Sequence, residues 1–226
     1  MHRIKWLKVE WNQKYNTVID AILNDSYNDE KQYGFKAHKR RDRFLNATYI
    51  FKKEIEEIIE NPFTNESIVY QKIVYEQTTF TLEDNELGIE IHNPPRTIQS
   101  LLNNFASMSK FNITIKPIEL DLSECITRLK TNFTNIVVSE IECSNIKLEE
   151  HTTVKIIAKN KVSDTLQDIK SFLDKKIFTI EKIKCNFTID SISGSFELTK
   201  NGSLKTNKSN LEVLLPIIKF AIQSQD

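Results

Sequence analysis

A strand–helix–strand pattern that occurs twice constrains the fold of this chain more than any other feature. The first copy spans residues 87–122 and the second spans residues 152–189. In each copy a helical segment, with apolar residues at three- and four-residue steps, lies between two short segments rich in Ile, Val or Thr. Helices that alternate with strands in this way predict a sheet with helices packed on it.

The two copies also align residue by residue. Ile98 and Leu101 of the first copy correspond to Leu166 and Ile169 of the second at the same offset. Two explanations remain open, because a true internal duplication and a shared apolar periodicity produce the same match. The common order of elements holds under either explanation.

Two helices are expected ahead of the repeats. Residues 3–24 carry apolar side chains at helical spacing, although the first ten residues also fit a short strand. A second helix is expected from about Lys36 or Asp42 to Glu60, and Pro62 stops it because the residue before a proline avoids helical backbone angles. Its apolar stripe consists of Phe44, Ala47, Phe51, Ile55 and Ile58. Together the two segments predict an N-terminal helical hairpin.

The rest of the chain alternates between strand and helix patterns. β-branched and aromatic residues predict strands at 67–82 and 87–92, and Asn93 with Pro94 suits the start of a helix at 94–109. The remaining expected elements are strands at 111–122, 135–148, 152–159, 177–190 and 194–200, helices at 164–176 and 209–223, and a turn at 201–202.

We therefore expect an α+β fold. It consists of an N-terminal helical hairpin, two similar β-β-α-β units in a largely antiparallel sheet, and a C-terminal helix. The corresponding segments are residues 1–62, 63–133 and 134–226, and the last two can form one compact domain. A chain of 226 residues is long enough to bury such a core.

Composition narrows the range of function classes. The 31 basic and 31 acidic side chains balance, which argues against a strongly polybasic protein. No run of about eighteen apolar residues predicts a membrane span, and the charged start does not fit a signal peptide. The three cysteines are widely spaced, as expected of buried thiols in a reducing compartment. We expect a cytoplasmic protein, and the abundance of Lys, Asn and Ile suggests an AT-rich bacterial or phage genome.

Motifs for catalysis and cofactor binding are missing from the sequence. Four glycines cannot build a glycine-rich phosphate loop, and the four histidines lack the spacing of a zinc site. No Glu is followed two residues later by Lys, as a restriction-type nuclease requires, and Asp168 with Lys170 lies on an expected helix. Asp84, Glu86 and Glu90 are the remaining candidates for a metal-dependent nuclease. We expect no catalytic residue, no metal and no cofactor, so an enzyme is the less favoured interpretation.

The segment FKAHKRRDR, residues 35–43, is the candidate binding site. As a helix it would place Lys36, Arg40 and Arg43 on one face, with Lys39 and Arg41 nearby. Positive charge at a helix N-terminus opposes the helix dipole, which indicates a role in binding rather than in local stability. Three explanations stay open: a nucleic-acid backbone, an acidic patch on a protein partner, or a solvated face that the acidic run 54–60 neutralises in part.

These observations predict a non-enzymatic accessory subunit of a bacterial or phage nucleoprotein assembly, for instance in phage defence. It would bind nucleic acid or a larger protein complex through the five basic residues, without a membrane. The alternatives are a divergent metal-dependent nuclease and a purely structural homodimer. Tyr70, Tyr75 and Phe80 lie on an expected strand, where core packing is favoured over base stacking.

Overall fold

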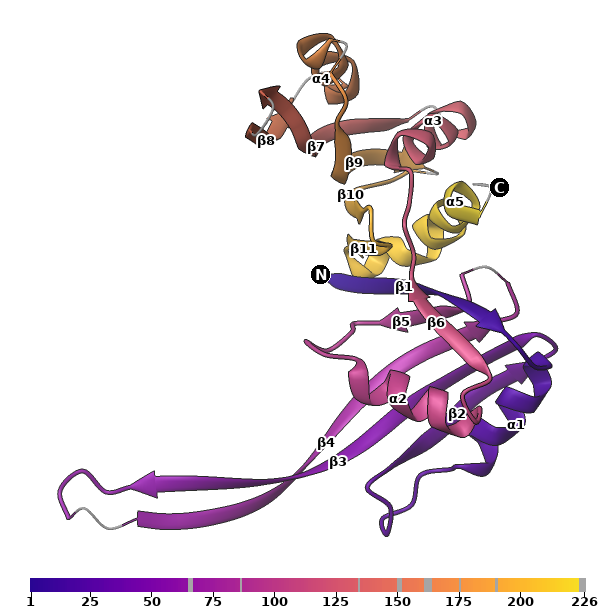
Figure 1. Ribbon diagram of the computed structural model, residues 1–226, viewed down its shortest axis with the longest axis vertical. Helices are drawn as coiled ribbons and strands as arrows, with labels where there is room; N and C mark the ends of the chain where they lie inside the picture. Colours follow the sequence, from indigo (N-terminus) through magenta and orange to yellow (C-terminus); the bar gives the residue numbers. More distant parts are fainter. Residues whose placement is uncertain are drawn as a thin grey trace. The chain divides into compact units, whose positions relative to one another are not determined.

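The computed structural model describes residues 1–64, 67–85, 87–133, 135–149, 152–160, 164–174, 176–189 and 191–223 (Figure 1). Within these residues, ten strands hydrogen-bond in the order β2-β3-β4-β5-β1-β11-β10-β9-β7-β8, and an eleventh strand, β6, pairs with β1. The chain divides into two compact units. Unit 1 comprises residues 1–8 and 116–226, and unit 2 comprises residues 9–115.

Unit 2 holds a sheet and two helices. Its elements are the end of β1 (His2–Trp11), α1 (Tyr15–Asn24), β2 (Tyr33–Arg41), β3 (Phe44–Glu60), β4 (Ser67–Glu83), β5 (Ile89–His92), α2 (Gln99–Met108) and the start of β6 (Ile113–Pro117). Strands β2 to β5 form consecutive antiparallel pairs.

One face of this sheet carries the hydrophobic core of unit 2. Phe105 of α2 stacks on Phe35 of β2, with ring centroids 5.6 Å apart, and meets the edge of the Phe80 ring of β4 at 5.1 Å. Tyr15 of α1 is buried and its hydroxyl donates a 3.0 Å hydrogen bond to the carbonyl oxygen of Leu82. Both helices therefore pack on the same face, which leaves the other face to polar residues.

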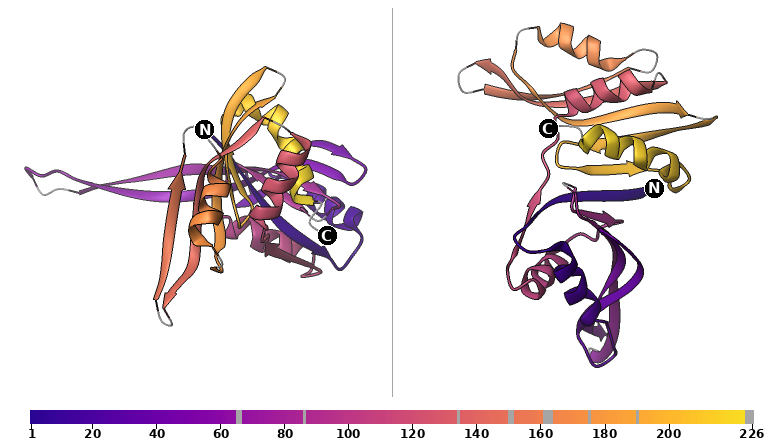
Figure 2. Two further views of the ribbon diagram at one scale, coloured as in Figure 1. Left: turned by 90° about the horizontal axis from the view of Figure 1, so that it is seen from above. Right: turned by 90° about the vertical axis from the view of Figure 1, so that its right-hand side faces the viewer.

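Strands β3 and β4 continue far beyond the rest of this sheet. Each has seventeen residues, and they pair without interruption from Phe44–Glu83 to Glu60–Ser67. Strand β2 flanks β3 only as far as Phe51, and β5 flanks β4 only from Thr79 onward. We call residues 52–60 and 67–75 the arm; Figures 1 and 2 show it as a two-stranded ribbon that extends away from the strands of unit 2.

Unit 1 holds the remaining strands and three helices. Its elements are the start of β1, the end of β6, α3 (Leu122–Asn132), β7 (Ile136–Glu149), β8 (Thr152–Lys159), α4 (Thr165–Leu173), β9 (Thr179–Ile189), β10 (Ile192–Thr199), β11 (Ser203–Thr206), a 3₁₀ turn (Lys208–Asn210) and α5 (Leu211–Gln223). Helices α3 and α5 lie side by side (Figure 2), and α4 packs on β7 and β8.

The β10–β11 turn of unit 1 depends on a glycine. Gly202 has a positive φ of 72°, and a Cβ atom there would lie 2.0 Å from a methyl carbon of Ile118. Its carbonyl oxygen accepts a 2.9 Å hydrogen bond from the backbone N–H of Trp6, which is fully buried. The turn expected at Asn201–Gly202 is confirmed.

The expected N-terminal helical hairpin is wrong. Residues 2–11 form strand β1, so only the second half of the expected first helix exists, as α1. Residues 36–60 form β2 and β3 instead of a helix. The apolar positions of this segment fit a strand as well as a helix, because Leu45, Ala47 and Tyr49 alternate as a strand face requires, and these three are its buried apolar residues. Pairing with β4 overrides the helix-forming composition of residues 53–60.

The two similar β-β-α-β units are also wrong. Strand β6 pairs with β1, whereas its expected counterpart β9 pairs with β7 and β10. Helix α3 was not expected, although Asp121 caps it and Leu122, Cys125, Ile126 and Leu129 are spaced as one helical face. Helix α2 begins later than expected, because Asn93 has a positive φ of 45° and does not cap it.

Several single elements are confirmed. These are β4, β5, β7, β8, β9, β10, α4 and α5. The expected division into residues 1–62, 63–133 and 134–226 stays a prediction. In the part of the chain that the structure describes, no helix is long and apolar enough to cross a membrane.

Replacing Phe105 tests the core of unit 2. We expect Phe105→Ala to lower the free energy of unfolding by about 3–5 kcal/mol, because it removes a ring packed between two aromatic side chains and leaves a cavity. Urea unfolding followed by circular dichroism measures the change. Ser107→Ala, at an exposed position of the same helix, is the control and should change it by less than about 0.5 kcal/mol.

Candidate functional site

The basic segment lies on an edge strand. Residues 35–41 belong to β2, which pairs with β3 alone among the described strands, and a turn at Asp42–Arg43 leads into β3. Arg43 takes a positive φ of 55° in this turn. A β-bulge at His38 shifts the register between Ala37 and Lys39. The expectation that these residues form a helical face is therefore wrong, and the strand distributes their side chains differently.

Two of the five basic residues are held in ion pairs. Arg40 lies opposite the buried Leu45, on the helix-covered face, and donates a 2.9 Å hydrogen bond to Asp20 of α1. Arg43 donates at 2.9 Å to Asp84 at the end of β4. Both arginines tie parts of unit 2 together, so they are poor candidates for direct contact with a partner.

The other three basic residues share the opposite face of β2. Lys36 pairs with Thr48, Lys39 with Asn46 and Arg41 with Phe44, and all three cations are exposed. None of them forms an ion pair with a residue that the structure describes. We call Lys36, Lys39 and Arg41 the basic face.

The strands beside the basic face present uncharged polar groups. The row that starts at Lys36 continues through Thr48 and Thr79 to His92, across β3, β4 and β5. The Thr48 hydroxyl lies 2.8 Å from Nε2 of His38 and 3.1 Å from the Thr79 hydroxyl. Thr48 is buried, so the groups near this row that an anion can reach include the exposed His38 imidazole and the half-buried Thr79 hydroxyl.

A second row starts at Lys39 and runs through Asn46 and Thr81 to Glu90. The Asn46 amide donates to the Phe80 carbonyl oxygen at 3.4 Å and to the Thr81 hydroxyl at 3.3 Å. Glu90 is buried three strands away from Lys39, and its carboxylate lies 3.0 Å from Nε2 of His92. The positive charge on this face of the sheet therefore lies on β2, and the β5 end of the row is acidic.

The candidate residues for a nuclease do not form a metal site among the described residues. Asp84 is bonded to Arg43, Glu90 lies beside His92, and Glu86 lies outside the described residues. Asp168 lies on α4, as expected, and accepts a hydrogen bond from Asn160. No group of three His, Cys, Asp or Glu side chains with metal-binding geometry occurs in the described ranges.

The cysteines are buried. Burial raises the pKa of the Cys143 thiol to about 11 and raises the pKa of Cys185 further. Cys125 is also buried, against α5, where its sulfur lies 3.9 Å from the carbonyl oxygen of Ala221. A thiol protonated at neutral pH is a weak nucleophile, so Cys143 and Cys185 are structural residues.

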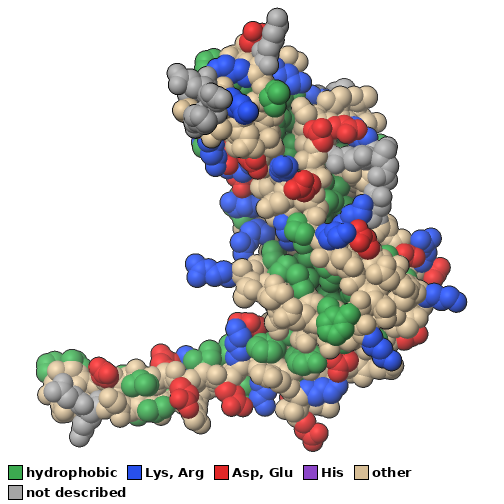
Figure 3. All heavy atoms as spheres, viewed as in Figure 1, with side chains coloured by type: hydrophobic (Ala, Val, Ile, Leu, Met, Phe, Trp, Pro, Cys, Tyr) green, Lys and Arg blue, Asp and Glu red, His purple; other side chains and the backbone are tan. Residues whose placement is uncertain are grey.

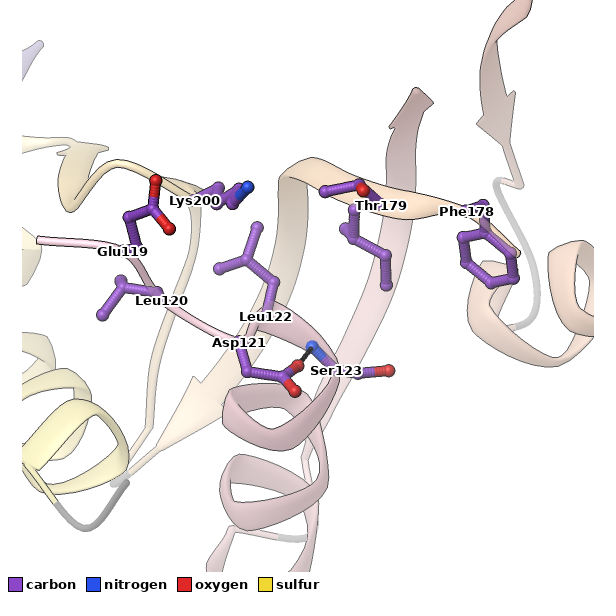
Figure 4. Close-up of a pocket in the computed structure, with 9 residues that line it drawn as sticks. Glu119, Leu120, Asp121, Leu122, Ser123, Phe178, Thr179 and Lys200 are labelled. Carbon is purple, nitrogen blue, oxygen red and sulfur yellow. Dashed lines mark hydrogen bonds between the residues drawn. The ribbon is translucent and has the colours of Figure 1, made fainter. Parts of the chain in front are cut away.

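A pocket of about 440 Å³ lies in unit 1, between the start of α3 and strand β9 (Figure 4). Its charged lining residues are Glu119, Asp121 and Lys200. The Asp121 carboxylate caps α3 and accepts backbone hydrogen bonds from Ser123 at 2.9 Å and Glu124 at 3.1 Å. Asp121 therefore has a structural role in this pocket.

The polar face of the unit 1 sheet is an ion-pair network. Glu140 of β7 pairs with Lys159 at 3.0 Å and with Lys182 at 3.7 Å, while Glu142 pairs with Lys182 at 3.3 Å and with Lys155. Hydrogen bonds from Lys159 and Lys155 lower the pKa values of Glu140 and Glu142, respectively. Because these lysines are held in ion pairs, this face is a weaker binding candidate than the basic face of unit 2.

A comparison of the sequence with models of known protein families found no match, and a search among curated proteins found none either. The case for a function therefore rests on the geometry of the side chains.

The ion-pair network gives unit 1 a pH-dependent stability. The pKa of Glu142 is lower in the folded chain than its ordinary value of 4.5, so its contribution is complete above that pH and is lost as the pH falls through the folded value. We expect Glu142→Gln to lower the free energy of unfolding by about 1 kcal/mol at neutral pH. The difference from wild type should shrink below about pH 4.5.

Urea unfolding at a series of pH values measures this difference. Glu212→Gln, at an exposed residue outside the network, serves as the control. A Glu142→Gln effect that stayed constant down to pH 3.5, about one unit below the ordinary glutamate value, would contradict the assignment.

Proposed function

We propose that the protein is a non-enzymatic accessory subunit of a nucleoprotein assembly, and that the basic face binds the phosphate backbone of a nucleic acid. The observation that supports this function best is the arrangement of Lys36, Lys39 and Arg41. Three exposed cations occupy successive positions on one face of an edge strand, and none pairs with a described carboxylate.

The spacing of these cations suits an extended polyanion. Same-face positions on a strand repeat at about 7 Å, so the three side chains form a line along β2. Long, exposed Lys and Arg side chains reach several phosphates from such a line without a rigid pocket. Binding of this kind is independent of base sequence, since phosphate contacts carry no sequence information.

The residues beside the basic face favour a nucleic acid over an acidic protein surface. The half-buried Thr79 and Asn46 lie in the rows next to the cations, whereas Thr48 is buried. Hydroxyl and amide groups donate hydrogen bonds to phosphate oxygens. A protein interface, by contrast, usually has an aromatic or apolar centre, which these two rows lack.

Arg40 and Arg43 belong to this proposal only as flanking charges. Their ion pairs with Asp20 and Asp84 hold them on or near the other side of β2 and reduce their effective charge. The bacterial or phage setting, including phage defence, stays a prediction from the sequence. The expectation that no cofactor takes part, which rests on missing motifs, also stays a prediction.

A salt series of fluorescence anisotropy measurements tests the basic face. Wild type should bind labelled DNA or RNA more weakly as salt increases, because binding releases condensed counterions. We expect Lys36→Gln/Lys39→Gln/Arg41→Gln to reduce the slope of log K against log salt by about 3 for duplex DNA and by about 2 for a single strand.

The control removes the same charge from unit 1, by Lys170→Gln/Lys176→Gln/Lys208→Gln at three exposed positions. This variant should keep the wild-type slope. Absence of binding at low salt, or equal losses in both triple variants, would rule out the basic face. The same samples incubated with Mg²⁺ and then with EDTA test for nuclease activity, and metal-dependent cleavage would contradict a non-enzymatic role.

A further inference from the structure

The arm of unit 2 exposes apolar side chains on both of its faces. Ile58, Val69 and Ile73 lie on one face and are 64%, 56% and 52% exposed. Ile68 and Tyr70 lie on the other face and are 55% and 52% exposed. Figure 3 shows hydrophobic side chains interspersed with acidic ones along the arm. Tyr70 and Tyr75, for which core packing was favoured, are thus exposed, while Phe80 is buried.

An arm of this kind lacks what usually stabilises a hairpin. Two strands without a third strand or a packed face are marginally stable in water. No described strand pairs with the outer edge of β4 between Ser67 and Thr78, or with the outer edge of β3 beyond Lys53. Free strand edges with apolar side chains are templates for pairing with another strand.

The two edges of the arm differ strongly in charge. On β3 the arm carries Glu54, Glu56, Glu57 and Glu60 beside two lysines. On β4, residues 67–75 read SIVYQKIVY and contain a single charge, Lys72. Charged side chains on an edge strand oppose pairing, so the β4 edge is the one open to a partner strand.

The β4 sequence is complementary to itself in the antiparallel direction. In an antiparallel strand pair, two residues that lie opposite each other either both exchange backbone hydrogen bonds across the pair or both do not. Identical strands can therefore pair symmetrically only when one residue lies opposite its own copy, and the twofold axis passes between these two copies. An axis at Gln71 brings Val69 opposite Ile73 of the second strand and Ile68 opposite Val74. Tyr70 then lies opposite Lys72, which allows a cation–π contact, and within residues 67–75 no like charges meet.

The β3 edge has no equivalent register. With the axis at any residue from 54 to 58, at least one glutamate lies directly opposite another glutamate. Like charges directly opposite each other destabilise a strand pair. Self-pairing therefore selects β4 over β3.

We infer that two copies of this chain associate through their arms, with β4 of one copy antiparallel to β4 of the other around a twofold axis at Gln71. The product is a four-stranded sheet in the order β3, β4, β4 and β3. Because β3 pairs Ile58 with Val69, one face of this sheet gains a continuous row of Ile58, Val69 and the partner copy's Ile73. The glutamates of β3 lie on the two outer edges, where they block further strand addition.

Cysteine cross-linking tests the axis. Gln71→Cys places two thiols opposite each other at the axis, where the Cα–Cα distance of about 4.5–5.5 Å suits a disulfide. Glu56 pairs with Gln71 in the same row, so Glu56→Cys is the matched control. Its two copies would lie three strands apart, at about 14 Å, which is too far for a disulfide. The native cysteines are all buried.

Mild oxidation should convert Gln71→Cys, and not Glu56→Cys, into a covalent dimer of twice 26.4 kDa. A dimer from Glu56→Cys alone would overturn the assignment to β4. Monomeric wild-type protein at every concentration in sedimentation velocity, together with no cross-link in either variant, would overturn self-association itself.

A charge swap tests the register independently. Val69→Lys/Ile73→Lys places like charges opposite each other in both symmetric pairs, and should weaken the dimer at least about tenfold. Val69→Glu/Ile73→Lys places opposite charges there while it keeps the lysine at position 73 beside Glu54 of β3, as in the first variant, and should restore dimerisation to within about tenfold of wild type. Equal weakening in both variants, with intact circular dichroism spectra, would contradict the register at Gln71. These variants leave the basic face unchanged, so the result is separable from nucleic-acid binding.

Discussion

The antiparallel ladder between β3 and β4 is the interaction on which the structure of unit 2 depends. Seventeen consecutive residue pairs fix the register of both strands. At one end the ladder supplies Leu45, Ala47 and Phe80 to the core beneath α1 and α2. At the other end no described strand flanks it, and it becomes the arm. A one-residue slip would exchange the two faces, burying the polar row and exposing the core residues.

Both units have helices on one face of the sheet and polar side chains on the other, but the charges of the polar face are paired differently in the two units. In unit 1 the lysines of the polar face are held in ion pairs, since Glu140 and Glu142 pair with lysines of the neighbouring strands. In unit 2 the basic face has no such described partners. This difference, rather than net charge, distinguishes a binding surface from a structural one.

Charge is also sorted within unit 2. The basic face lies on β2, whereas residues 54–60 and 67–75 of the arm carry four glutamates and one lysine. A polyanion would be attracted to the first and repelled by the second, so the two surfaces suit different partners. If two copies pair through their arms, each assembly presents two basic faces. Two linked sites bind one polymer more tightly than either does alone, which fits a subunit of a nucleoprotein assembly.

The sequence by itself determined the elements in which one period dominates. Strands β4, β7 and β9 and helices α4 and α5 follow from alternation or from three- and four-residue spacing, and Asn201–Gly202 specifies its turn. The sequence alone did not decide between a helix and a strand for residues 44–60, because their apolar positions fit both the helical and the strand period and the composition of residues 53–60 favours a helix. Only pairing with β4 decided for a strand, since a long ladder outweighs local propensity.

Strand formation in this region also determined the geometry of the candidate site. The sequence identified the five basic residues, but their division into two ion-paired arginines and three exposed cations depends on strand register, on the bulge at His38 and on the positions of Asp20 and Asp84. Partners distant in sequence are not encoded in local spacing. The charge contrast between β3 and β4 was present in the sequence from the start. It became meaningful only when the tertiary structure placed the two segments side by side with their outer edges free.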